Sequence, residues 1–220
     1  SGLSSLAARR AGARVTSFDY DPASVACTRE LKRRFQDGDP DWTVAEGSAL
    51  DRQYLESLGT FDIVYSWGVL HHTGNMWTAL ENVVSVVRPG GALFIAIYND
   101  QGTSSRIWLR IKKAYCASPR PVQWLLLLAV ATYATVKASF GRLLRGENPL
   151  PWISWTQYDK GRRGMSWWRD LVDWVGGYPF EVAKPEEILD FYRQRGFELH
   201  RLKTWGGKLG CNEYVFRRRR

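Results

Sequence analysis

The sequence predicts an α/β fold with a doubly wound, mainly parallel sheet. Short apolar runs alternate with amphipathic stretches of helix length through the first hundred residues, at about 25 to 30 residues per unit. Parallel strands require such crossover helices, whereas antiparallel strands can be joined by tight turns. The chain has 220 residues, 45% of them hydrophobic, so it can bury one sizeable core and is not a disordered chain.

The elements of the first half follow from spacing and from helix start and stop signals. Leu3 and Leu6 recur at helical spacing before Gly12, and Pro22 stands in the first turn of a second periodic stretch. Runs rich in β-branched and aromatic residues mark the strands. The expected elements are helices over residues 3–12, 22–35 and 76–87, strands over 15–18, 42–46, 61–67 and 92–99, and a Pro-Gly-Gly turn over 88–91.

The strand ends are the place to look for a binding site. In open sheets of this class, ligands bind outside the carboxyl ends of the parallel strands. We therefore expect the four segments that follow these strands to lie along one edge. They are Asp19-Tyr20-Asp21, Gly47-Ser48-Ala49-Leu50, Ser66-Trp67-Gly68 and Tyr98-Asn99-Asp100.

Four segments in register resemble a known family. They read SGLSSLAARRAGARVTSFDYDP, AEGSALD, FDIVYSWGVLHH and RPGGALFIAIYN, across residues 1 to about 100. Together they resemble the class I S-adenosylmethionine-dependent methyltransferases, of the small-molecule type that includes ubiquinone-biosynthesis O-methyltransferases. The resemblance implies a Rossmann-like cofactor-binding core over residues 1–100. It also implies that residues 184–220 complete the sheet with a helix and an antiparallel hairpin at its edge.

The resemblance implies a cofactor site for S-adenosyl-L-methionine. Asp19 would accept hydrogen bonds from the ribose hydroxyls, which a charged acceptor makes strong, and Tyr20 offers a flat surface for the adenine. Asp21 is the more natural cap for the following helix, and a cap is also the alternative for Asp19. Ser48 would reach the adenine amine, unless its loop is a plain turn around Gly47. The further expected cofactor contacts are Ala49, Leu50, Ser66, Trp67 and Gly2.

The start of the chain departs from the family pattern. Gly2 resembles the end of a glycine-rich loop, and we expect the strand and the earlier glycines that precede this loop in the family to be missing. That strand is normally central and buried on both faces, so its loss should expose apolar surface and weaken the cofactor site. We therefore expect the sequence to be a fragment that is not necessarily active alone.

Two adjacent histidines, His71 and His72, follow the third strand. We expect no metal site, because His200 is the only other histidine and no Cys or carboxylate set has ligand spacing. One of the two imidazoles is a candidate general base that would accept the proton of the acceptor, and His72 is preferred over His71. In the alternative, His71 packs under the cofactor and His72 begins a helix. Asn99 and Tyr98 are candidates for orienting the acceptor, although Tyr98 would serve equally well as a wall.

Residues 101–183 form a helical and aromatic insertion outside the minimal fold. The 16 residues from 121 to 136 carry no charge. This run is shorter than the roughly 20 residues needed to span a bilayer. Three interpretations stay open. They are a buried lid over an apolar acceptor pocket, an interfacial helix that gives peripheral membrane contact through residues 121–145 with the help of Arg142 and Arg145, and a helix for self-association.

The net charge and the cysteine content indicate which partners and which cellular compartment to expect. The formal net charge is +9, which favours an anionic partner. We expect the arginines at 217–220 to be a solvated tail. Three widely spaced cysteines indicate no disulfide framework, and residues 1–14 lack the apolar run of a signal peptide. A cytoplasmic setting, with membrane association as a further expectation, fits these observations.

The predicted function is methyl transfer from S-adenosylmethionine to a small, apolar or aromatic acceptor, with oxygen favoured. A nucleic-acid methyltransferase is the second hypothesis, because a basic and aromatic patch could stack bases and bind phosphate. The same patch could instead line a pocket for a small molecule. Its residues are Arg162, Arg163, Trp167, Trp168 and Arg169. A non-catalytic cofactor-binding or scaffolding module is the third hypothesis.

Overall fold

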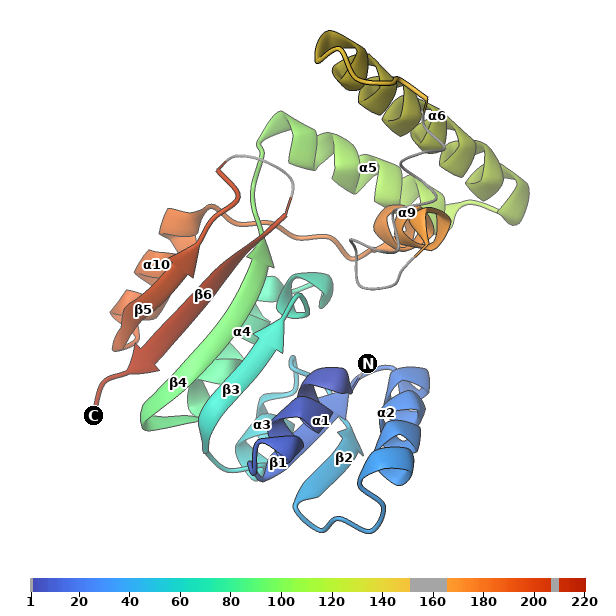
Figure 1. Ribbon diagram of the computed structural model, residues 1–220. Helices are drawn as coiled ribbons and strands as arrows, with labels where there is room; N and C mark the ends of the chain where they lie inside the picture. Colours follow the sequence, from blue (N-terminus) through green and yellow to red (C-terminus); the bar gives the residue numbers. More distant parts are fainter. Residues whose placement is uncertain (1, 151–165, 207–209) are drawn as a thin grey trace. The chain divides into compact units, whose positions relative to one another are not determined.

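The computed structural model describes residues 2–150, 166–206 and 210–220 and divides into two compact units (Figure 1). Unit 1 consists of Ser1–Ile97, Pro185–Thr204 and Cys211–Arg220. Unit 2 consists of Tyr98–Lys184 and Trp205–Gly210. Unit 1 thus joins the first part of the chain to two C-terminal segments.

The N-terminal part of unit 1 alternates helices with two parallel strands. The strands pair along their whole length, from Val15 opposite Trp42 to Asp19 opposite Glu46. The indole of Trp42 is completely buried, and its Nε1 donates a hydrogen bond to Ser17 Oγ at 3.0 Å. The elements are α1 (Leu3–Arg10), β1 (Val15–Asp19), α2 (Pro22–Phe35), β2 (Trp42–Glu46) and α3 (Arg52–Ser57).

The second part of unit 1 is a four-stranded sheet with the strand order β3-β4-β6-β5. Strands β3 and β4 are parallel, and β5 and β6 form the expected antiparallel hairpin at the edge. The α/β fold class is thereby confirmed, with a mixed sheet that includes parallel strands. The elements are β3 (Phe61–Trp67), the 3₁₀ helix η1 (Leu70–His72), α4 (Met76–Ser85), β4 (Val87–Tyr98), α10 (Pro185–Gln194), β5 (Phe197–Lys203) and β6 (Cys211–Arg218).

The sheet of unit 1 is in two pieces. Among the described residues, β1 and β2 pair only with each other, and no strand joins them to β3. One face of β3 exposes apolar side chains, since Ile63 and Tyr65 are 70% and 49% exposed. The opposite face is covered by α4 and α10, which are tied together where the Tyr192 hydroxyl donates to the Leu80 carbonyl at 3.2 Å (Figure 1).

Two local features differ from the sequence prediction. The Pro-Gly-Gly segment is not a turn that precedes a strand but lies inside β4. At this segment the pairing register of β3 and β4 shifts, from Phe61 opposite Val87 to Ile63 opposite Ala92. Gly90 there has a φ of 76°, a left-handed conformation that glycine adopts without strain. The short helix α3 was not predicted, because six residues carry too little periodicity to reveal it.

The arginines at the C-terminus were expected to be a solvated tail, and two of them are engaged instead. The Arg218 guanidinium donates to the carbonyl oxygens of Val84 and Val87, at 3.1 and 2.6 Å. Arg219 forms an ion pair with Glu198 at 2.9 Å. The physical reason is that β6 continues to Arg218, so the sheet holds the backbone of this run in place.

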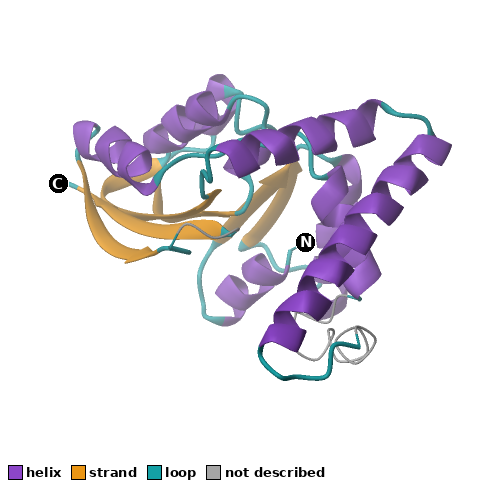
Figure 2. Cartoon of the chain, turned by 90° about the horizontal axis from the view of Figure 1, so that it is seen from above, coloured by secondary structure: helices purple, strands orange, loops and turns teal. Residues whose placement is uncertain are grey.

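Unit 2 is helical, and its two long helices are joined by a short loop (Figure 2). Its core is the cluster of Leu127, Val130 and Val175, against which aromatic and aliphatic side chains from α5 and α9 pack. The uncharged run predicted over 121–136 is part of a longer helix. The described helices are α5 (Thr103–Ala117), α6 (Arg120–Leu144) and α9 (Trp167–Gly176).

Unit 2 also buries one lysine. The Lys112 ammonium donates to the Trp174 carbonyl oxygen, and its Nζ lies 3.9 Å from the centre of the Trp174 ring and 5.0 Å from that of Phe180. Such contacts with aromatic faces stabilise a cation. Burial nevertheless lowers the pKa of Lys112 to about 8, and the nearby Cys116 opposes this shift.

Candidate active site

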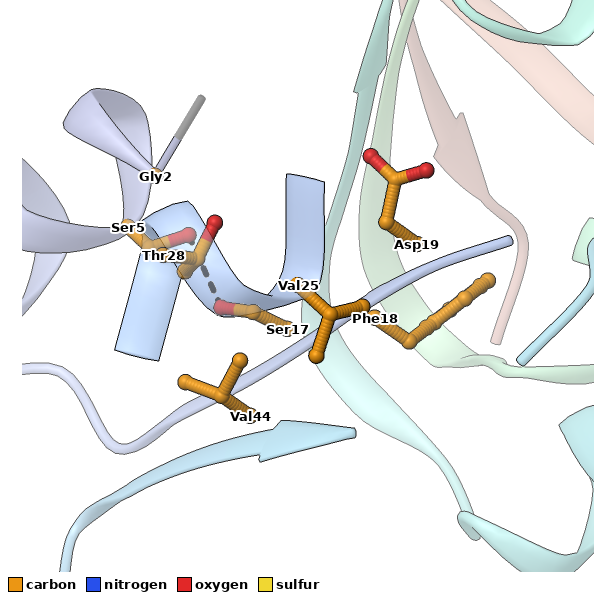
Figure 3. A pocket seen from close by; sticks show the side chains of 8 residues that line it. All are labelled: Gly2, Ser5, Ser17, Phe18, Asp19, Val25, Thr28 and Val44. Carbon is orange, nitrogen blue, oxygen red and sulfur yellow. Dashed lines mark hydrogen bonds between the residues drawn. The ribbon is translucent and has the colours of Figure 1, made fainter. Parts of the chain in front are cut away.

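A cavity of about 80 Å³ opens at the carboxyl end of β1 (Figure 3). Asp19 is the acidic residue of its lining, and it stands at the last position of the strand. Helices α1 and α2 contribute the wall on the other side, where Thr28 is buried. The complete lining is Gly2, Ser5, Ser17, Phe18, Asp19, Val25, Thr28 and Val44.

Asp21 caps α2, as the sequence predicted, whereas Asp19 has a different partner. The Asp21 carboxylate caps α2 by accepting from the backbone amides of Ala23 and Ser24, at 3.1 and 3.0 Å, and from the Ser24 hydroxyl at 2.8 Å. These hydrogen bonds, with that of the Ser24 hydroxyl foremost, lower the pKa of Asp21. Asp19 accepts one hydrogen bond at Oδ1, from the Asp21 amide at 3.0 Å. Its other carboxylate oxygen has no hydrogen-bond partner among the described residues.

Gly2 begins α1 beside this cavity. It precedes the helix with a φ of 83°, and its carbonyl oxygen accepts the first helical hydrogen bond, from Leu6 at 2.9 Å. A Cβ atom at this position would lie 3.0 Å from the Thr28 side chain. Glycine is therefore favoured both by the backbone conformation and by the close approach of α2.

The loop after β2 is held against the end of β1. The Gly47 amide donates to the Asp19 carbonyl oxygen at 3.0 Å, and a Cβ at Gly47 would lie 2.2 Å from the Tyr54 ring. Ser48 Oγ accepts from the Leu50 amide at 3.1 Å, which is the turn that the alternative interpretation of this loop predicts. The Ser48 side chain thus shapes the loop.

A residue that sequence reasoning missed anchors the same loop. The Asn82 side chain on α4 is almost completely buried, and its Nδ2 donates to the Ala49 carbonyl oxygen at 3.1 Å. This hydrogen bond links the loop after β2 to the helix that follows β3, although the two sheets share no ladder. An Asn in an otherwise apolar stretch of helix is the sequence signal that could have pointed to it.

The end of β3 carries the histidines. Ser66 and Trp67 are half-buried and pair with Ile95 and Ala96 of β4. His71 is completely buried, and its ring centre lies 4.5 Å from that of His72, which is partly exposed. Of the two side chains, His72 is therefore the one with exposed surface, whereas His71 is enclosed by the protein.

The remaining predicted residues are distributed differently. Tyr20 is 78% exposed and does not line the cavity. Asn99 belongs to unit 2, where it is buried. Its backbone amide donates to the Gly210 carbonyl oxygen at 3.0 Å. In the proposed base-stacking patch, Arg162 and Arg163 lie outside the described residues, and Trp168 stacks on Trp124 with ring centres 5.7 Å apart.

Comparisons with known proteins agree with this architecture. Residues 1–93 match the family model described as "Methyltransferase domain". A search of curated proteins finds no match. The fold is similar to that of magnesium protoporphyrin IX methyltransferase (ChlM) from Synechocystis PCC 6803 with bound SAH, at 14% identity and a TM-score of 0.52, over 99% of this chain and 70% of that one.

Two further structures share the fold. One is Burkholderia thailandensis 1,6-didemethyltoxoflavin-N1-methyltransferase with 1,6-didemethyltoxoflavin and S-adenosylhomocysteine, at 13% identity and a TM-score of 0.51, over 100% of this chain and 67% of that one. The other is the [4+2]-cyclase SpnF, at 11% identity and a TM-score of 0.56, over 99% of this chain and 71% of that one. Identities this low establish the fold only. Residues 1–93 therefore match a methyltransferase domain, and the chain has the fold of the class I S-adenosylmethionine-dependent methyltransferases.

Proposed function

We propose that this methyltransferase binds the nucleoside of S-adenosylmethionine at the carboxyl ends of β1 and β2 and methylates a small, apolar or aromatic acceptor, with oxygen as the favoured atom. The observation that carries the proposal is the Asp19 carboxylate. It lines the cavity at the end of β1, and one of its oxygens has no hydrogen-bond partner among the described residues.

The residues around Asp19 fit a nucleoside. A ribose presents two neighbouring hydroxyl donors, and a carboxylate is an acceptor with capacity for both. The loop from Gly47 to Leu50 is fixed beside it through the Gly47 amide, and Leu50 contributes a partly exposed apolar side chain on which an adenine can rest. Tyr20, with its ring in solvent, is available for the same purpose from the other side of Asp19.

The chain supplies alignment and proton handling. Bound S-adenosylmethionine provides a methyl group on a positively charged sulfur, so no metal ion is needed to activate the leaving group. Holding the acceptor in line with the methyl group and the sulfur lowers the activation barrier by a large part in reactions of this kind. His72 is proposed to accept the proton of the acceptor's hydroxyl group, because its ring is partly exposed just beyond the end of β3.

The acceptor class rests on the side chains near the end of β3. Trp67 is half-buried there and Val69 is more than half exposed, so an apolar or aromatic molecule would find matching surface. The choice of oxygen over nitrogen rests on the initial resemblance to O-methyltransferases.

A second use of the fold must be tested against the first. One structure with this fold is a [4+2]-cyclase, so the architecture also serves a reaction other than methyl transfer. The test is calorimetric titration of the chain with S-adenosylmethionine and S-adenosylhomocysteine, followed by screening of acceptors with methyl-labelled cofactor. Binding with label transfer to an apolar or phenolic acceptor supports the proposal. Binding without transfer to any acceptor favours a non-methylating module, and transfer to nucleic acid alone contradicts the acceptor class.

A further inference from the structure

Helix α6 exposes a long apolar stripe. Its side chains are 59–66% exposed, although they are large and hydrophobic. No described residue covers them. The stripe consists of Leu125, Leu128, Tyr133, Val136, Phe140 and Leu143, and we refer to these six residues as the α6 stripe.

The six residues lie on one face of the helix. They follow one another in steps of three to five positions, which keeps them on the same side at 3.6 residues per turn. The opposite face carries Leu127, Val130 and Ala131, which are buried against the rest of unit 2. The helix is therefore apolar all round, with one face used inside the unit and the other open.

Within unit 2, α6 is mostly exposed. Of the most apolar 18-residue window of α6, 11% is buried. In length and composition, α6 is the one helix among the described residues that could cross a membrane. Its inner face is nonetheless packed against α5 and α9, which carry exposed charges such as Arg110 and Arg169. Crossing a bilayer would take those charges with it, so a position along the membrane surface is favoured.

Along α5 and α6 the charged residues are all basic. Residues 101–146 contain eight Lys and Arg and no Asp or Glu. Lys112 is buried, whereas Arg106, Arg110, Lys113, Arg120 and Lys137 are exposed. Lys137 lies beside the stripe, with Nζ 5.8 Å from the centre of the Tyr133 ring. Arg142 and Arg145 form ion pairs with Glu147, just beyond this segment.

We propose that α6 docks along the surface of an anionic lipid bilayer, with the α6 stripe in the acyl boundary and the surrounding Lys and Arg at the headgroups. The apolar face supplies burial, and the basic residues supply attraction to anionic headgroups, the combination that amphipathic interfacial helices use. Exposed Trp124 and Tyr133 are residue types that settle at the membrane interface. The inference does not depend on the methyl-transfer proposal.

The same charge argues against two other occupants. A second copy of this chain would bring an equally basic segment against the stripe, and like charges at an interface oppose association. A nucleic acid would match the charge but would leave the aliphatic residues of the stripe, such as Leu125 and Val136, without an apolar partner. An anionic bilayer satisfies both features at once.

The test is vesicle flotation with the full chain. We expect binding to phosphatidylcholine vesicles that contain phosphatidylglycerol, binding at least about tenfold weaker to pure phosphatidylcholine, and loss of binding as salt is raised. The double variant Leu125→Glu, Val136→Glu should lower the partition coefficient by at least about tenfold. Leu199→Glu, an exposed leucine of unit 1, is the matched control and should bind like the unchanged chain. Lys137→Glu tests the electrostatic part separately, and circular dichroism checks that each variant is folded.

Three outcomes would overturn the proposal. The first is unchanged flotation of the double variant, and the second is equal binding to neutral and anionic vesicles. The third is no vesicle binding together with either a dimer that the double variant dissociates or tight binding of an oligonucleotide. Sedimentation velocity and a labelled oligonucleotide titration measure these alternatives.

Discussion

The backbone amide of Gly47 donates a hydrogen bond of 3.0 Å to the carbonyl oxygen of Asp19. This contact joins the ends of β1 and β2 at the point where the two strands leave the sheet. It fixes the loop proposed to hold the adenine relative to the carboxylate proposed to hold the ribose. The two halves of a nucleoside site are thus set by one main-chain contact, and each can be tested separately.

Replacing Asp19 by Ala should weaken S-adenosylhomocysteine binding at least about tenfold, because hydrogen bonds to a charged group contribute about 1.5 to 3 kcal/mol. Isothermal titration calorimetry measures the loss. The matched variant is Asp21→Ala, which removes the cap of α2 and should lower the free energy of unfolding by about 1 kcal/mol. If both variants lost stability and neither lost affinity, the ribose assignment would be wrong.

Replacing Gly47 by Ala should destabilise unit 1 by about 1 to 3 kcal/mol, since the new Cβ would lie 2.2 Å from the Tyr54 ring. Urea denaturation measures the change. The double variant Gly47→Ala, Tyr54→Leu replaces the ring by a smaller side chain and should recover part of the lost stability. Gly141→Ala in α6 has room for a Cβ, so it should be neutral or slightly stabilising. A Gly47→Ala chain as stable as the original would contradict the close contact.

Replacing His72 by Ala should lower turnover by about 10² to 10⁴ if this imidazole is the general base. The rate of the unchanged chain should fall at acidic pH, where an imidazole becomes protonated and can no longer accept a proton. The variant should lose that limb of the profile. His200→Ala, on the exposed edge strand β5, is the control and should leave the profile unaltered. An identical pH profile for His72→Ala removes the base role.

Lys112 should make stability depend on pH between its folded pKa of about 8 and its unfolded value near 10.5. In that window the unfolded chain binds more protons than the folded chain, so the free energy of unfolding rises as pH increases, by up to about 1.4 kcal/mol per pH unit. Lys112→Met should flatten this slope, whereas Lys113→Met on the exposed side should not. Urea denaturation at several pH values compares the three chains, and equal slopes would exclude the effect.

Most elements of the fold could be predicted because their patterns are local. The strand over 61–67 and the helix over 22–35 appear with the predicted boundaries, since apolar spacing and Pro22 mark them. The Pro-Gly-Gly segment was assigned to a turn because those residues break regular structure. Pairing with β3 overrides that preference and keeps the segment within β4 as an irregularity in the ladder.

The candidate site could be predicted only where it follows directly from a strand end. The capping role of Asp21 was foreseen, because a cap has a fixed distance from its helix. The anchoring role of Asn82 was not foreseen, because it depends on α4 passing behind the loop after β2. The burial of His71 beside a half-exposed His72 likewise depends on tertiary packing, which adjacent letters in a sequence do not encode.

The absence of a shared ladder between the described strands of the two sheets has a consequence for how the molecule loses structure. Opening β1 and β2 breaks no backbone hydrogen bond of β3, β4, β5 or β6, so the nucleoside-holding part can melt as a separate cooperative block. Its amide protons should then exchange with deuterium earlier than those of the larger sheet. A nucleoside bound to Asp19 would slow the exchange of these amide protons, so cofactor binding could be detected before the acceptor is identified.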